Sequence, residues 1–284
     1  MRFIGTLFPL FTLVILPFRD SHGREHAARL RFSAVFDVCR NNEYHQWVRP
    51  KVSEFATMQN AMAHLPISET AIADLLTPFL GEASLSEHQM HQVAVYIELL
   101  LRWNEKINLT AVRDPEEIVT RHFGECFFAA RHLFSNDESP GTAIDIGSGA
   151  GFPGLPIKIL APNVNMTLVE SNNKKVVFLR EVVRSLGLAD VNVIAIRAEE
   201  IQDSADLVTL RAVERFQKTL PIAGRLAKSK GRVALLIGGA QMQVAESLLP
   251  DVSWEKPIPV PLSLNRVFAI GHNNEGSSLR RPFF

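Results

Sequence analysis

A glycine-rich turn near the middle of the chain carries the residue types best suited to holding a cofactor. The string AIDIGSGAGFPGLP places Gly147, Gly149 and Gly151 at alternate positions, after an apolar segment that ends at Ile146 and before a helix expected near Pro153. Glycine lets the backbone approach a ligand closely, and the start of a helix offers free N–H groups to it. The turn therefore predicts a nucleotide-like cofactor site, although dinucleotide-binding enzymes use a similar turn.

Two acidic residues flank this turn. Asp145 stands two positions before the first glycine, and Glu170 follows the next apolar segment, 170 − 147 = 23 positions after Gly147. An acid at the second position binds the ribose hydroxyls of a nucleoside cofactor. A carboxylate aimed into the turn from Asp145 suits a ligand with an amino group and a sulfonium better than a pyrophosphate. The alternatives are a turn-capping role for Asp145 and a solvated strand end at Glu170.

A third apolar segment ends at Ile196 and is followed by the sequence RAEE at 197–200. In a parallel sheet, this places Ala198 and Glu199 at the carboxyl edge beside the same crevice. Their backbone groups are suited to bracketing an adenine. The alternative is that Glu199 and Glu200 are acids at the start of a helix, where they interact favourably with the helix dipole.

The elements that must position these residues alternate in type. Short apolar segments are separated by helical patterns, which is typical of βαβ units and a parallel sheet. We expect strands at 143–146, 166–170, 191–196, 206–210 and 232–237, helices at 174–186 and 216–226, and final antiparallel strands at 254–261 and 266–270. The sequence thus predicts an α/β fold.

The preceding part of the chain is helical in pattern. Apolar residues recur at helical spacing over 67–80 and 86–106, and Pro115 suits the first turn of a helix that runs to His132. We divide the chain into an N-terminal extension, a helical cap, a Rossmann-like core and a flexible tail. Their ranges are 1–57, 58–140, 141–270 and 271–284.

An apolar stretch from Phe3 to Phe18 follows Arg2 at the start of the chain. It resembles the hydrophobic part of a signal peptide, but it is shorter than the roughly 20 residues of a spanning helix, and Pro9 interrupts it. We interpret residues 1–57 as an extension upstream of a misassigned start, because Met58 stands just before the first organised segment. A signal or anchor and a structured extension are the other interpretations.

The composition excludes some classes of protein. Lys plus Arg and Asp plus Glu both number 30, so contact with nucleic acid must come from local patches of charge. The two cysteines, Cys39 and Cys126, lack metal-ligand spacing, so we expect neither a disulfide framework nor a bound metal. A cytoplasmic location fits this pattern.

Longer strings identify a family resemblance. They are the segment WNEKINLTAVRDPEEIVTRH at 103–122, the glycine-rich turn, and the later segments TLVES, RAEE and LRAV. Together they closely resemble the RNA small-subunit methyltransferase G family, formerly called glucose-inhibited division protein B. The match spans about residues 65 to 270. It implies a Rossmann-like class I S-adenosylmethionine-dependent methyltransferase fold with an N-terminal helical cap.

The resemblance also implies a reaction, which is transfer of a methyl group from S-adenosylmethionine to N7 of guanine 527 in 16S ribosomal RNA. The partner would be this RNA or the 30S particle, with no stable membrane contact, and we expect a monomer. Arg211 is the residue expected nearest the chemistry, as a catalytic group. The predicted cofactor-binding residues, including those from the turn and ribose arguments, are Gly147, Gly149, Phe152, Glu170, Ala198, Glu199 and Arg211.

The chain departs from the family pattern at two places. Where the family has the motif RHxxDS, this chain has Glu125 and Cys126 in the last two positions, and Ile237 stands where relatives usually carry a lysine. A cofactor-binding RNA module without activity, and a methyltransferase with another substrate, are therefore alternatives. A third, a dinucleotide-dependent oxidoreductase, is disfavoured by Asp145. We expect Trp103, Phe123 and Phe152 to be core residues rather than stacking platforms.

Overall fold

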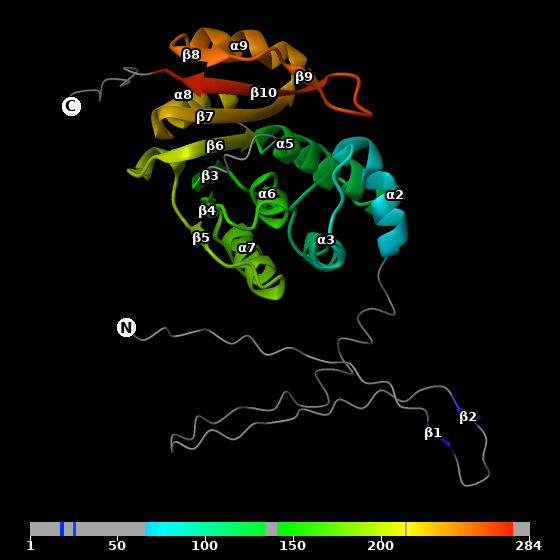
Figure 1. Cartoon of the computed structure of the whole chain (residues 1–284). Helices are drawn as coiled ribbons and strands as arrows, with labels where there is room; N and C mark the ends of the chain where they lie inside the picture. The colour runs from blue at the N-terminus through cyan, green and yellow to red at the C-terminus, as the bar shows by residue number, and fades with distance from the viewer. Residues whose placement is uncertain (1–17, 20–24, 27–65, 135–140, 214, 275–284) are drawn as a thin grey trace, which may run out of the picture. The chain divides into compact units, whose positions relative to one another are not determined.

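The computed structural model of the chain describes residues 18–19, 25–26, 66–134, 141–213 and 215–274 (Figure 1). The chain forms two compact units, Met1–Glu54 and Phe55–Phe284. In the first unit, strand β1 (Phe18–Arg19) pairs antiparallel with strand β2 (Glu25–His26). The rest of the predicted signal-like segment, Met58 and the end of the tail lie outside the described residues.

A single mixed sheet organises the second unit (Figure 1). Its strands are β3 (Thr142–Ile146), β4 (Asn165–Val169), β5 (Val191–Ile194), β6 (Ala205–Arg211), β7 (Ala227–Gly238), β8 (Val252–Trp254), β9 (Ile258–Pro259) and β10 (Arg266–Asn273). The order is β5-β4-β3-β6-β7-β10-β8, with β9 on β10. Strands β3 to β7 are parallel and β10 is antiparallel to β7, as predicted. The strand expected at 254–261 is instead divided into β8 and β9, which both pair antiparallel with β10. The order differs from the doubly wound 3-2-1-4-5-6 by insertion of the antiparallel strand.

Helices and short helical turns connect these strands. They are α6 (Gly154–Leu160), α7 (Asn173–Ser185), α8 (Phe216–Leu226) and α9 (Met242–Leu248), with short 3₁₀ turns η2 (Ala198–Glu200) and η3 (Gly239–Gln241). Helix α7 begins where the side chain of Asn172 accepts hydrogen bonds from the N–H groups of Lys174 and Lys175. It ends before Gly187, as its sequence predicts. Helix α9 was not predicted, because its seven residues are too few to establish a helical period.

The predicted helical cap is present. It consists of α2 (Glu69–Leu80), α3 (Glu87–Asn104), α4 (Pro115–Ile118), a π-helical segment η1 (Val119–Gly124) and α5 (Glu125–Leu133). Ser86 and Gln89 form a capping box at the start of α3. The stretch predicted as one helix from Pro115 is continuous, but its middle turn is widened into η1. None of the described helices is long and apolar enough to cross a membrane.

Two apolar clusters cover the faces of the sheet. Alternate strand residues point to opposite faces, so Leu207 of β6 joins one cluster and its neighbour Val208 joins the other. The first cluster also contains Phe79 of α2, Phe127 of α5 and residues of α6 and α7, whereas α8 and α9 cover the second. The cap therefore packs on one face of the sheet and shares its core.

The predicted boundary of the tail is wrong by three residues. Strand β10 continues through Gly271, His272 and Asn273, which the polar sequence had suggested were flexible. The side chain of Asn273 is buried, and its Nδ2 donates a hydrogen bond to the carbonyl of Ala227 at 2.8 Å. A polar residue can therefore extend the strand because the neighbouring strand satisfies its side chain.

Candidate cofactor site at the carboxyl edge of the sheet

The glycine turn lies where β3 ends, beside the end of β4. Gly147, Gly149 and Gly151 all have positive φ angles of 67°, 58° and 89°, a region that glycine adopts without strain. The N–H groups of Gly147 and Ser148 donate to the carbonyl of Val169 at 2.9 and 3.0 Å. The turn is thereby fixed against the neighbouring strand, with the backbone of Gly147 exposed.

Glu170 is placed to support this turn directly. One carboxylate oxygen accepts from the N–H of Gly149 at 3.0 Å and the other from the N–H of Asn172 at 2.7 Å. The residue is buried, so it is not a solvated strand end. Each oxygen keeps a second lone pair, which leaves acceptors for hydroxyl groups of a ligand. Its role toward ribose stays a prediction.

Asp145 does not point into the turn, which corrects the expectation from its position. Its side chain is fully buried, with one oxygen accepting from the hydroxyl of Thr209 at 2.7 Å and the other from the N–H of Gly154 at 3.3 Å. Burial raises its pKa to about 6, against these hydrogen bonds, which lower it. The residue joins β3 to β6 and to the start of α6, as the capping alternative proposed.

The far end of the turn is held by aromatic residues. Phe152 is buried and stacks on Tyr96 of α3, with ring centroids 5.3 Å apart and an interplanar angle of 2°. The hydroxyl of Tyr96 donates to the carbonyl of Ala150. A Cβ atom on Gly151 would collide with that hydroxyl and lie 2.5 Å from Leu155. Only glycine fits this position, because the cap packs directly against the turn.

Arg211 ends β6 and faces the cap. Its Nη2 lies 2.7 Å from the carbonyl of Arg121, 3.0 Å from Oε2 of Glu125 and 3.1 Å from Nδ1 of His122, so its two hydrogens are shared among three acceptors. The guanidinium also lies 5.9 Å from the ring centre of Phe152. Arg211 thus joins the end of β6 to η1 and α5, and its predicted catalytic and cofactor-binding roles stay predictions.

Glu125 is the acid at the centre of this contact. Its side chain is only 4% exposed, and its second oxygen lies 3.0 Å from Nε of Arg266 in β10. One carboxylate therefore faces two guanidinium groups, which leaves a net positive charge in the cluster. The longer acid in place of the family's aspartate reaches both arginines. Beside it, burial raises the pKa of the Cys126 thiol to about 12, so this cysteine is not a nucleophile.

The contact with Arg211 determines the protonation of His122. A guanidinium can only donate, so Nδ1 of His122 is the acceptor and the proton is on Nε2. That nitrogen lies 2.7 Å from the hydroxyl of Thr110. Burial, together with Arg211 and Arg121, lowers the pKa of His122 from 6.5 to about 3. The imidazole is therefore neutral at physiological pH and connects Thr110 to Arg211.

This neutral histidine predicts acid sensitivity. In the unfolded chain His122 binds a proton near pH 6.5, whereas in the folded chain it does so only near pH 3, so stability is lost as pH falls between these values. From pH 7 to pH 5 we expect its contribution to the free energy of unfolding to fall by about 2 kcal/mol. Urea unfolding of the wild type and His122→Gln at both pH values measures the difference. Asp145 titrates in both proteins, so its contribution cancels in the difference. Identical pH dependences of the unfolding free energy in the two proteins would contradict the prediction.

The family string at 103–122 has a structural explanation. The side chain of Asn104 accepts from the N–H groups of Leu109 and Thr110 and donates to the carbonyl of Thr110. It thereby shapes the loop that presents Thr110 to His122, which in turn contacts Arg211. This connected series is not apparent in the sequence, because its members are separated by up to 211 − 104 = 107 positions. In the sequence, only the residue spacing within the string at 103–122 pointed to it.

Other predicted residues occupy less connected positions. Ala198 and Glu199 follow β5 at the carboxyl edge, and no hydrogen bond within the described residues links them to the turn; Glu200, by contrast, caps η2 as a helix-start acid. Phe123 is fully buried, as expected. Trp103 is only partly buried: it packs against the apolar cluster and donates from Nε1 to Glu181.

Ile237 is buried in the cluster beneath α8 and α9.

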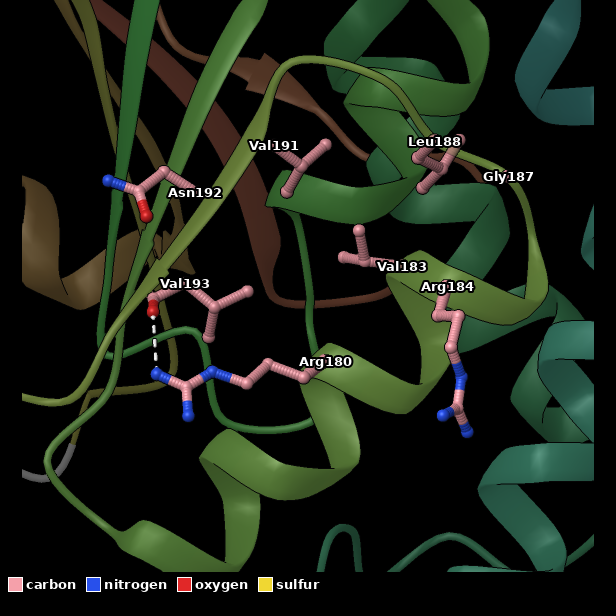
Figure 2. Close-up of a pocket in the computed structure, with 8 residues that line it drawn as sticks. All are labelled: Arg180, Val183, Arg184, Gly187, Leu188, Val191, Asn192 and Val193. Atoms are coloured by element: carbon pink, nitrogen blue, oxygen red, sulfur yellow. Dashed lines mark hydrogen bonds between the residues drawn. The ribbon is translucent and has the colours of Figure 1, made fainter. Parts of the chain in front are cut away.

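Two hollows in the described surface lie apart from the turn. One, of about 430 Å³, lies between α7 and the edge strand β5; there Arg180 donates to the carbonyl of Val193, whereas Arg184 points away from that contact (Figure 2). Because α7 ends and β5 begins there, it lies at the amino edge of the sheet. The second, of about 530 Å³, follows β6 and β7 at the carboxyl edge. Its lining residues are Arg215, Phe216, Gln217, Lys218, Gln241 and Val244.

The sheet order and the glycine turn define a Rossmann-like class I S-adenosylmethionine-dependent methyltransferase fold. The structure is similar to magnesium protoporphyrin IX methyltransferase from Synechocystis PCC 6803, with a TM-score of 0.51 and 13% identity over 68% of this chain and all of that one. At this identity the likeness shows the fold alone.

Sequence comparison identifies the family. The family model for rRNA small subunit methyltransferase G matches residues 89–255. A ribosomal RNA small subunit methyltransferase G from Xylella fastidiosa is 40% identical over 171 residues, covering 58% of this chain and 78% of the relative. Another from Exiguobacterium sp. is 35% identical over 224 residues, covering 70% and 92%. The chain belongs to the rRNA small subunit methyltransferase G family, which confirms the resemblance.

Proposed function

We propose that this chain methylates N7 of guanine 527 in 16S ribosomal RNA. It is a ribosomal RNA methyltransferase by family, and its methyl donor is S-adenosylmethionine, which supplies a methyl group on a positively charged sulfur. The finer assignment of guanine 527 and its N7 comes from the family resemblance. The side chains with partners around the turn support N7, because they do not offer a base or a nucleophile.

Four titratable side chains that the structure places around the turn already have structural partners or are buried. Both oxygens of Glu170 accept backbone N–H groups, and Nδ1 of His122 faces Arg211. Asp145 is buried beneath the turn, and the Cys126 thiol stays protonated. N7 of guanine has a lone pair and no proton, so its methylation requires neither base nor nucleophile. Positioning of the two reactants supplies the catalysis instead.

The residues of the turn fit the cofactor. A Cβ atom on Gly149 would have only the carbonyl of Gly147 within 4 Å, at 3.7 Å, so open space lies beside the backbone there. Glu170 offers acceptors for the ribose hydroxyls at the same place. We propose that Gly147, Gly149 and Glu170 hold the nucleoside part of the cofactor. Arg211 would orient the reacting groups from the side of the cap, where positive charge also favours an RNA phosphate.

Complementation tests the proposed reaction. The full-length chain is expressed in a bacterial strain that lacks this ribosomal methylation, and N7-methylguanosine is mapped in its 16S RNA. We expect methylation to return at guanine 527, and not with Gly147→Val as the inactive control. Methylation at another nucleotide, or none from a protein that binds S-adenosylhomocysteine, would reject the assignment and favour a different substrate or an inactive RNA module.

We propose further that the hollow at the carboxyl edge binds the substrate RNA near the target base. Arg215 and Lys218 are exposed on it, and Phe216 and Val244 give it an apolar floor. Cationic and apolar groups together suit a nucleotide, since phosphates supply affinity and bases need apolar contact. Its place beyond the ends of β6 and β7 is where ligands of such sheets bind.

Neutralising these two cations should weaken RNA binding. For Arg215→Gln/Lys218→Gln we expect lower affinity for a 16S RNA fragment, and a slope of log affinity against log salt that is smaller by about 2, because each phosphate contact contributes about 1. Titration at several salt concentrations measures both.

The matched control is Arg180→Gln/Arg184→Gln, which removes two arginines from the hollow at the amino edge (Figure 2). Equal slopes for the two double variants would show that only net charge matters and would reject this surface.

A further inference from the structure

Helix α3 is fastened to the core along one face. Side-chain nitrogens of Gln89 and Gln92 donate to the carbonyls of Ile159 and Leu186, both at 2.8 Å. Further along, Tyr96 donates to the turn, and Trp103 donates to Glu181 at 3.0 Å. The positions 89, 92, 96 and 103 share one side of a helix. The cap is therefore attached at α6, the end of α7 and the glycine turn, rather than lying loosely over the site.

The contact at Tyr96 differs from the others because it reaches the cofactor turn. Tyr96 is fully buried between Phe152, which it stacks on, and Phe123, whose ring it meets edge-on at 5.1 Å. Burial raises the pKa of its hydroxyl well above 10, so the group stays protonated and donates. Its acceptor, the carbonyl of Ala150, lies between Gly149 and Gly151, which both have positive φ angles.

We infer that Tyr96 is a positioning residue for the cofactor, which acts by holding the glycine turn in its binding conformation from the cap. The turn has glycines at three of its positions, so its backbone has more alternative conformations than any other residue type would allow. Glu170 restrains it from the sheet side through Gly149, and Tyr96 restrains it from the cap side through Ala150. The cap is then part of the cofactor site and not only a surface for RNA. This inference rests on the proposed binding of S-adenosylmethionine at the turn.

Tyr96→Phe is the decisive variant, because it removes the hydroxyl and keeps the stacked ring. In the full-length protein we expect the dissociation constant for S-adenosylhomocysteine, measured by calorimetry, to rise about tenfold, which is near the upper range for one neutral hydrogen bond. Without ligand, hydrogen exchange of peptides covering 147–152 should become faster. The affinity for the 16S RNA fragment should not change.

Gln92→Met is the matched control. It removes a buried hydrogen bond between the same helix and the end of α7, away from the turn, and keeps the size of the side chain. We expect unchanged affinity for S-adenosylhomocysteine and unchanged exchange at 147–152. The inference is overturned if Tyr96→Phe binds within twofold of the wild type, or if both variants lose affinity equally. If the wild type does not bind S-adenosylhomocysteine, the proposed function fails, and the exchange rates alone decide whether Tyr96 holds the turn.

Discussion

Gly149→Ala is expected to weaken binding of S-adenosylhomocysteine by at least about tenfold while the protein stays folded. The added methyl group would project into the open space beside the turn, where the cofactor is proposed to lie. The residue has a φ of 58°, so alanine there costs about 1 kcal/mol of stability as well. Calorimetry gives the affinity, and urea unfolding gives the stability.

Gly187→Ala separates these two effects. Gly187 has a φ of 61°, and a Cβ atom there would meet nothing within 4 Å, so the backbone strain and the free space match those at Gly149. It follows α7, at the other edge of the sheet. We expect the same loss of stability with no loss of cofactor affinity. If the two alanine variants bind the cofactor equally well, the turn is not the site.

Arg211→Ala is expected to lower the free energy of unfolding by about 3 kcal/mol, since removing one partner of a buried ion pair leaves the other charge uncompensated. Glu125 would keep only the partly exposed Arg266, and both Nδ1 of His122 and the carbonyl of Arg121 would lose their donor. Urea unfolding at pH 7 measures the loss. A variant of Arg211 thus tests the fold as well as the chemistry, so its activity alone cannot assign a catalytic role.

Lys228→Ala provides the comparison for an exposed pair in the same sheet. Lys228 lies 2.9 Å from a carboxylate oxygen of Asp206, but both side chains are about 40% exposed. Such pairs contribute about 0 to 1 kcal/mol. Equal, small losses in Arg211→Ala and Lys228→Ala would mean that the contact between cap and sheet contributes little.

Local patterns were sufficient for much of the fold. The strand at 143–146 and the helix at 216–226 are predictable because their apolar periods are complete within a few residues, and the turn is predictable because glycine spacing is itself the signal. The cap is likewise predictable from its helical spacing, and the family string added the class of enzyme. Helix α9 and the widened turn η1 were missed, because neither leaves a distinct local pattern.

Contacts between distant segments were not predictable in this way. Asp145 stands in sequence beside the turn, but the hydroxyl of Thr209 and the N–H of Gly154 draw its carboxylate beneath the sheet edge. Tyr96 is one apolar position among several on α3, and nothing near it in sequence indicates that its hydroxyl meets Ala150. Side-chain direction depends on partners brought close by folding, which composition and spacing do not contain.

The apolar cluster shared by cap and sheet limits how the molecule can be divided. Phe79 of α2 and Leu100 of α3 belong to the same buried cluster as Leu168 of β4 and Phe268 of β10. A fragment beginning at residue 141 would keep α6 and α7 but would expose to water the apolar surface that the cap covers, at a cost in hydrophobic free energy. The cap is consequently not a module that can be exchanged between enzymes. Any chimera must contain the cap and the sheet surface that it packs on from the same protein, so that their side-chain volumes match.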